Sequence, residues 1–107
     1  MSGSFDAEDA RPHSVYAIFD RQERLLYIGC AHNVRERIGF HLEPSTQSPA
    51  SRVIQRLMWG WTSREFPTKA DARADERRLI REQMPLLNKQ HNPRYRKNVR
   101  ELPLTAA

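Results

Sequence analysis

Several side chains that can handle phosphate and protons recur along this sequence at spacings that would bring them together. Arg37 and His41 are four residues apart in a segment with a helical pattern, so they share a helix face with Asn33. A guanidinium can hold a phosphate through two hydrogen bonds, and an imidazole can move a proton near neutral pH. The alternative interpretation is a solvated helix face with no chemistry.

A carboxylate falls within the apolar stripe of a later predicted helix. At 100° per residue, Glu76 lies between Leu79 and Ile80 on the face that these two residues share. Ala72 and Gln83 lie on the same face. A carboxylate there must pair with a cation, bind a metal ion or take up a proton. An ion pair with an arginine, a metal site and a helix of different phase all remain open.

Two tyrosines, Tyr16 and Tyr27, lie in consecutive runs of β-branched and aromatic residues. The runs 13–19 and 25–30 predict strands, and the polar residues 20–24 between them predict an antiparallel hairpin. Pairing of the two strands puts the tyrosines at neighbouring positions. Taken alone, both are ordinary strand aromatics.

Capping residues and apolar spacing predict the helices that position these side chains. Asn33 and Glu36 begin a helix that ends near Leu42, with a buried stripe of Val34, Ile38 and Leu42. The elements that follow are a helix from Ser48-Pro49 to about Met58, a break at Gly60, a short strand over 61–66, and a helix from the Thr68/Asp71 capping box to about Met84, before Pro85.

The predicted order β-β-α-α-β-α gives an α+β fold, with a small three-stranded antiparallel sheet flanked by helices. A length of 107 residues is room for one domain. We place this domain at 13–90, after a flexible leader at 1–12 and before a basic tail at 91–107.

Charge and composition narrow the class of protein. Lys and Arg number 18 against 13 acidic residues, a net charge of +5 that suits a polyanionic partner, although solubility also explains it. No apolar run approaches the ~20 residues of a membrane span, and the acidic N-terminus is no secretory signal. The single cysteine, Cys30, excludes a disulfide framework and a multi-cysteine zinc site. We therefore expect a cytoplasmic protein with no membrane partner.

Taken together, these residues resemble the signature of the GIY-YIG endonucleases. The first motif stands here as Ser14-Val15-Tyr16, with serine and valine in place of glycine and isoleucine, and the second, Tyr27-Ile28-Gly29, is intact. The number of positions between the two tyrosines is the same as in the family's signature. Arg37 and His41 stand where the family has an arginine and then a histidine or tyrosine.

The last helix extends the resemblance over about residues 13–90. Glu76 matches the family's metal-binding glutamate, and Leu79-Ile80, Pro85 and Asn88 follow it in the family's order. The resemblance implies the GIY-YIG nuclease fold. It also implies hydrolysis of nucleic-acid phosphodiesters, for which we expect DNA, with one divalent ion, Mg²⁺ or Mn²⁺, on Glu76.

The resemblance also implies roles for the other site residues. Arg37 would neutralise charge on the phosphate in the transition state. Tyr16 would accept or orient the proton of the attacking water, which requires nearby cations to lower its pKa, and His41 would share that task. Tyr27 would position phosphate or water, and Asn88 would hold the helix end or the metal-binding carboxylate. The choice between Tyr16 and His41 as general base stays open.

One departure concerns phosphate contacts. Cys30 lies where several relatives carry a lysine beside the scissile phosphate, so we expect that contact either to be missing here or to come from His32 or a lysine of the tail. The further residues that we predict to contact nucleic acid are Arg35, Lys89, Arg94, Arg96 and Lys97.

Four functional interpretations remain at this point. The chain could be a stand-alone nuclease, or the catalytic piece of a larger repair, restriction or mobile-element enzyme. It could instead be a catalytically inactive nucleic-acid-binding module with the same fold, or a basic interaction domain unrelated to nucleases. A monomer and a homodimer both remain open.

Overall fold

The elements follow one another in the order predicted from the sequence. The computed structural model describes residues 10–46 and 48–95. In chain order its elements are β1 (His13–Asp20), β2 (Leu25–Ala31), α1 (Val34–Leu42), α2 (Pro49–Leu57), β3 (Met58–Phe66) and α3 (Lys69–Gln83). The α+β class and the three-stranded antiparallel sheet are therefore confirmed. None of these helices is long and apolar enough to cross a membrane.

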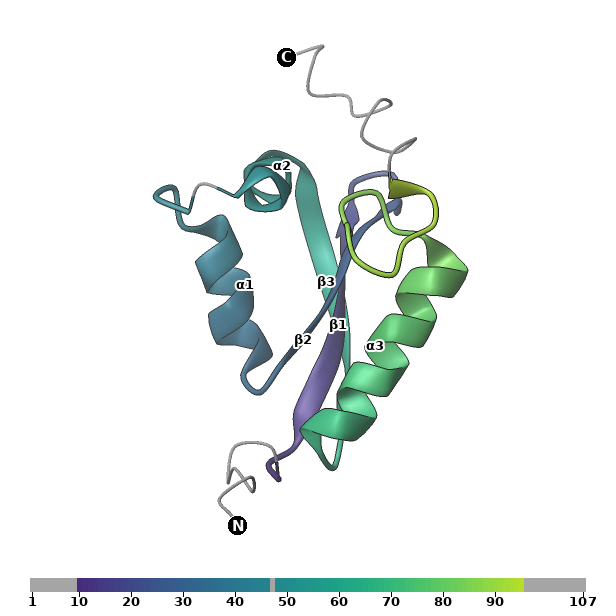
Figure 1. Ribbon diagram of the computed structural model, residues 1–107. Helices are drawn as coiled ribbons and strands as arrows, with labels where there is room; N and C mark the ends of the chain where they lie inside the picture. Colours follow the sequence, from purple (N-terminus) through teal and green to yellow (C-terminus); the bar gives the residue numbers. More distant parts are fainter. Residues whose placement is uncertain (1–9, 47, 96–107) are drawn as a thin grey trace.

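The sheet separates two hydrophobic clusters (Figure 1). Helices α1 and α2 cover one face and α3 covers the other. Tyr16 and Ile18 of β1 point into the cluster on the side of α1 and α2, whereas Val15 packs in the cluster with Ala72 and Ile80 of α3. Because the strand order is β2-β1-β3, the two layers can meet beside the sheet only at an outer strand, β2 or β3.

The register of the hairpin fixes the positions of the two tyrosines. Tyr16 lies directly opposite Gly29, and Ile18 lies opposite Tyr27. The tyrosines are therefore diagonal neighbours on one face, and their ring centroids are 6.2 Å apart. This confirms the prediction that strand pairing places the two tyrosines at neighbouring positions.

Helix α1 begins where the sequence predicts, but it buries a different stripe. The Asn33 side chain caps the helix by accepting a hydrogen bond from the backbone N–H of Glu36 (3.1 Å). The buried residues of α1 are Ile38 and His41, whereas Leu42 is 41% exposed. The predicted stripe is therefore wrong at its last residue, because the helix turns the His41 face and not the Leu42 face toward the sheet.

The boundary between α2 and β3 also differs from the prediction. The helix ends at Leu57, and β3 begins at once with Met58 and continues to Phe66. Gly60 lies within this strand, opposite Phe19, and breaks no helix. The strand is longer than predicted because it pairs with β1 over nearly the whole length of β1.

The segment after α3 closes the free edge of β2. Helix α3 follows its predicted N-cap, Thr68, and its C-cap is Met84, whose φ of 48° is left-handed. The backbone N–H of Leu87 then donates to the carbonyl oxygen of Leu26 (2.8 Å). The outer edge of β2 is thereby paired with the chain that follows α3.

Candidate active site

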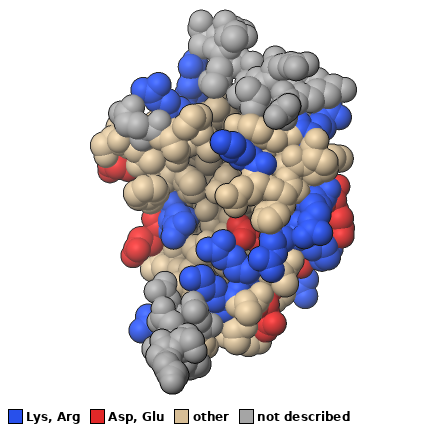
Figure 2. Space-filling model, viewed as in Figure 1, with Lys and Arg blue, Asp and Glu red and all other residues tan. Residues whose placement is uncertain are grey.

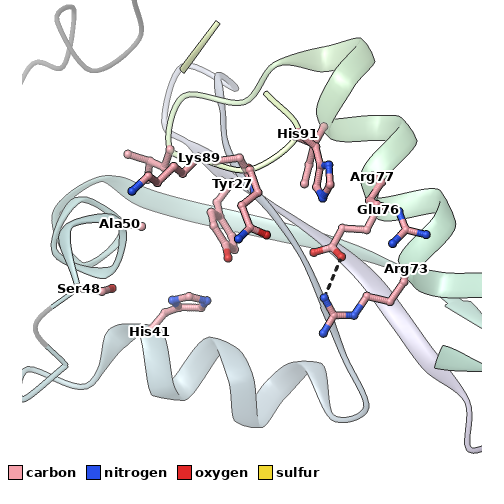
Figure 3. A pocket seen from close by; sticks show the side chains of 13 residues that line it. Tyr27, His41, Ser48, Ala50, Arg73, Glu76, Arg77, Lys89 and His91 are labelled. Atoms are coloured by element: carbon pink, nitrogen blue, oxygen red, sulfur yellow. Dashed lines mark ion pairs between the residues drawn. The ribbon is translucent and has the colours of Figure 1, made fainter. Parts of the chain in front are cut away.

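One pocket, of about 450 Å³, gathers residues from both layers beside the outer strand β2 (Figure 3). Tyr27 of β2 and His41 of α1 line it on one side, and Glu76 of α3 lines it on the other. Asn88, from the segment after α3, also lines it. We call this the central pocket. It brings together four of the six residues that the sequence predicts as catalytic.

A buried hydrogen-bond chain lies behind the central pocket. The hydroxyl of Tyr16, a residue only 1% exposed, lies 3.0 Å from Nε2 of His41. Nδ1 of His41 lies 2.9 Å from the hydroxyl of Ser51, which is buried on α2. Hydroxyl groups both donate and accept, so a neutral His41 can accept the Tyr16 proton at Nε2 while Nδ1 donates to Ser51. The interpretation of His41 as part of a solvated face is therefore wrong.

Burial controls the protonation of the residues in this hydrogen-bond chain. Burial, reinforced by the charge of Arg37, lowers the pKa of His41 below its ordinary value of 6.5, so His41 is neutral at pH 7. Burial also raises the pKa of Tyr16 far above its ordinary value, and Tyr27 raises it further. Arg37 opposes this shift without overcoming it. The expectation that cations lower the pKa of Tyr16 is therefore wrong, since loss of hydration outweighs the nearby charge.

Gly29 provides the space in which the Tyr16 ring lies. A Cβ atom at this position would overlap Cζ and the hydroxyl oxygen of Tyr16. The glycine of the Tyr27-Ile28-Gly29 motif is therefore required by close packing and not by an unusual backbone conformation, because its φ is not positive.

We expect the Gly29→Ala protein to be less stable than the wild type by about 1–3 kcal/mol, the usual cost of overpacking. Gly60→Ala is the matched control, because Gly60 also lies in a strand and a Cβ there would meet nothing within 4 Å. Alanine at Gly60 should be neutral or stabilising by about 0.5–1 kcal/mol. Urea denaturation measures both values. An equal effect of the two substitutions would contradict the packing argument.

Glu76 is partly buried, as its place in the apolar stripe predicts. Its side chain is 14% exposed, and Oε1 lies 3.8 Å from Nη1 of Arg73. This ion pair is one of the possibilities that the sequence leaves open. Burial raises the pKa of Glu76 above its ordinary value, and Arg73 and Arg77 counteract this only in part. The carboxylate is thus incompletely compensated within the protein, which leaves room for a further cation.

The donor set at Glu76 suits one class of metal ion. Within residues 10–46 and 48–95, no three His, Cys, Asp or Glu side chains are close enough to hold a metal ion together. A tetrahedral zinc site needs such a group, whereas Mg²⁺ keeps several waters and takes one or two protein carboxylates. Glu76 is therefore a candidate ligand for Mg²⁺ or Mn²⁺ and a poor one for zinc.

Arg37 lies outside the central pocket, in a second pocket of about 290 Å³ that we call the flanking pocket. Arg73 lines both pockets and so lies between them. The charge of Arg37 acts on Tyr16, Tyr27 and His41, in each case favouring loss of a proton. Arg37 is thus exposed, but its charge acts on the buried hydrogen-bond chain that contains Tyr16 and His41.

Asn88 has a different partner from the ones that the sequence suggested. Its Oδ1 accepts a hydrogen bond from the backbone N–H of Ile28, and its Nδ2 donates to the carbonyl oxygen of Ile28, both at 2.8 Å. It bonds to neither the end of α3 nor Glu76. Asn88 instead holds β2 in place, one residue after Tyr27.

The predicted nucleic-acid contacts divide between the two pockets. Cys30 and His32 line the flanking pocket, and Lys89 lines the central pocket. Arg35 and Arg94 are exposed. The remaining two, Arg96 and Lys97, lie outside the described residues, as do most of the predicted leader and tail.

The structure also adds residues that the sequence did not single out. Lys69 and Arg73 join Arg37 beside Cys30, and Arg77 and His91 line the central pocket. Lys and Arg side chains crowd around α3 on the face in Figure 2, which agrees with this placement. The spacing of Lys69, Arg73 and Arg77 along one side of α3 could have indicated them. The charge missing at Cys30 therefore has candidate donors on α3 and not only in the tail.

Known proteins are similar to this region. A family model described as the GIY-YIG catalytic domain matches residues 12–92. The UvrABC system protein C of Dichelobacter nodosus is 30% identical over 69% of this chain and 12% of its own length. The excinuclease cho of Salmonella typhi is 37% identical over 70% of the chain and 25% of its length. That of Escherichia coli strain K12 is 39% identical over 60% and 20%. The chain thus spans a quarter or less of these relatives.

Proposed function

Because this chain belongs to the family of GIY-YIG catalytic domains, we propose that it is a metal-dependent endonuclease that hydrolyses phosphodiester bonds of DNA. Two of the relatives are named excinucleases, which supports a nuclease. The net charge of +5 supports a polyanionic substrate. The observation that carries the proposal is the buried hydrogen bond between Tyr16 and His41, which lies beside a pocket that contains Glu76.

Water activation in this proposal is a relay through two residues. The attacking water gives a proton to the Tyr16 oxygen as Tyr16 passes its own proton to Nε2 of His41. The raised pKa of Tyr16 supports this order, because the phenol cannot stand ionised beforehand and needs a partner. The lowered pKa of His41 leaves its acceptor lone pair available at neutral pH. Ser51 then accepts a hydrogen bond from Nδ1 of the imidazolium.

The other residues bind and orient the phosphate. Glu76 would hold Mg²⁺ or Mn²⁺, which when bound supplies Lewis-acid stabilisation of charge on phosphate oxygens. Arg37 stabilises the charge that develops on the phosphate. Tyr27 is more exposed than Tyr16 and lines the central pocket, where it positions phosphate or water. Asn88 keeps Tyr27 in place by holding β2.

The test is cleavage of a supercoiled plasmid and of a single-stranded circle by the wild-type chain, with Mg²⁺, with Mn²⁺ and with EDTA. Nicking that requires the metal supports the endonuclease. The circle that is cut faster shows whether the protein prefers double-stranded or single-stranded DNA. Binding of either circle without cutting in any metal condition would instead support a catalytically inactive binding module.

Cleavage should depend on pH through two groups that must both be deprotonated. Burial lowers the pKa of His41 from its ordinary 6.5 and raises that of Glu76 from its ordinary 4.5. We therefore expect both groups to bind protons only below about pH 6.5. We expect kcat/KM to be level from about pH 6.5 to 8 and to fall at lower pH as His41 and Glu76 bind protons. A pH profile with Mg²⁺ measures this. A rate that rises on acidification would contradict the relay.

A further inference from the structure

Helix α1 exposes a phenyl ring beside the residue that we assign to the phosphate. Phe40 is 60% exposed, although a ring of this size gains much from burial. It follows Arg37 by three positions, so the two side chains share one flank of the helix. Together with Glu36 they line a surface hollow of about 410 Å³, which we call the α1 hollow. The ring therefore lies within reach of a ligand that Arg37 binds.

The end of α1 that carries Phe40 is held firmly. The carbonyl oxygen of Phe40 accepts hydrogen bonds from the hydroxyl of Thr46 (2.8 Å) and from the backbone N–H of Glu43 (3.3 Å). The amide of Gln55, on α2, donates to the carbonyl oxygens of His41 (3.1 Å) and Glu43 (3.0 Å). The exposure of Phe40 is therefore not the result of a frayed helix end. A ring on such a fixed backbone loses little conformational entropy when a ligand covers it.

The surroundings of Phe40 favour a nucleobase over a protein partner. Leu42, the other large apolar residue exposed on α1, is two positions further on and so lies roughly 200° around the helix. The two side chains do not form the continuous apolar stripe with which a helix docks on another protein. An aromatic ring next to an arginine is instead the arrangement that binds single-stranded nucleic acid, because the cation contacts a phosphate and the ring stacks on a base.

We propose that the α1 hollow receives a base of the cleaved strand, which stacks on the ring of Phe40 beside the phosphate that Arg37 contacts. This inference rests on the proposed function, because it takes the role of Arg37 from it. A base inside a duplex is covered on both faces by its neighbours, so it can stack on Phe40 only after it has left the duplex stack. The substrate class that follows is DNA with at least one unpaired base next to the scissile phosphate.

Binding of three short, fluorescently labelled oligomers tests the proposal. They are an oligothymidylate, an oligomer of the same length with abasic deoxyribose phosphates, and a fully paired hairpin. The protein carries Glu76→Gln and is kept in EDTA, so that no cleavage occurs. We expect Phe40→Ala to weaken binding of the oligothymidylate about five- to fiftyfold, and binding of the other two by less than about twofold. The slope of log K against log[salt] should not change, because no charge is removed.

Three further variants separate stacking from other effects of the substitution. Phe40→Tyr should restore binding, because it keeps an aromatic face and so shows that the loss is not one of folding. Phe40→Leu should not restore it, because this side chain is apolar but has no ring. Leu42→Ala removes an exposed apolar side chain from a different side of α1 and should change none of the three affinities.

The proposal is overturned if Phe40→Ala weakens binding of the abasic oligomer as much as that of the oligothymidylate, or acts no more strongly than Leu42→Ala. An equal loss on the hairpin would contradict the requirement for an unpaired base. A wild-type chain that binds with this dependence on bases but never cuts would overturn the endonuclease alone. One that cuts DNA without this dependence would overturn the stacking alone.

Discussion

We expect the Glu76→Gln protein to lose DNA cleavage by at least about 10³-fold, since an amide is a much weaker ligand for Mg²⁺ and the Lewis acid contributes several kcal/mol to the barrier. Glutamine has nearly the same shape, so the contacts of Glu76 in the partly buried stripe of α3 are kept. DNA binding in EDTA should persist, because it rests on the surrounding cations. Plasmid nicking and fluorescence anisotropy measure the two effects separately.

The same substitution should stabilise the fold at neutral pH. Burial raises the pKa of Glu76, so the folded protein holds this proton more tightly than the unfolded chain does. Ionisation above pH 4.5 therefore lowers the free energy of unfolding, and a neutral amide removes that penalty. Thermal melts of the two proteins at pH 7 should give the variant a Tm at least equal to that of the wild type. Loss of activity then cannot be assigned to misfolding.

Glu82→Gln is the matched control. Glu82 lies on the same helix, is exposed and forms an ion pair with Arg78 away from both pockets. It should cut DNA at the wild-type rate. Normal cutting by Glu76→Gln, or an equal loss in both variants, would contradict the assignment of Glu76 as the metal ligand.

Replacing Arg37 with alanine should lower kcat by about 10²–10³-fold, the usual cost of one preorganised contact to developing charge. The charge of Arg37 also favours the deprotonated form of His41, so the acid limb of the pH profile should move to higher pH in the variant. Single-turnover cleavage with the DNA fully bound measures kcat without the contribution of binding.

Two further variants define what Arg37 contributes. Arg37→Lys keeps the charge but loses the two parallel hydrogen bonds of a guanidinium, so it should recover only part of the rate. Arg56→Ala removes an exposed cation from the last turn of α2 and should leave kcat unchanged. If Arg37→Ala cut as fast as Arg56→Ala, Arg37 would belong to a solvated surface.

The parts of the site that the sequence predicted follow from the geometry of single elements. Helical periodicity is enough to place Glu76 among apolar residues, because position on a helix depends only on residue number. Hairpin pairing likewise places Tyr16 near Tyr27. The capping residues Asn33 and Thr68 also mark the helix starts correctly, since these bonds are local.

What the sequence could not predict depends on how separate elements pack. The hydroxyl of Ser51 reaches His41 only because α1 and α2 lie side by side on the sheet. The sign of the pKa shift of Tyr16 needs a comparison of burial with the charge of Arg37, and periodicity gives neither magnitude. The partner of Asn88 is a backbone group far away in the sequence, for which no side-chain pattern exists.

The pairing of Asn88 with Ile28 has a consequence for the order of events during synthesis. The two residues are 60 positions apart, so β2 leaves the ribosome long before its partner. In that interval its outer edge carries free amide and carbonyl groups, which are a template for pairing with another nascent chain. The strand that bears Tyr27 is therefore held in its final position only when nearly the whole domain has been made. The central pocket is thus completed, and the edge of β2 is protected against aggregation, in the same late step.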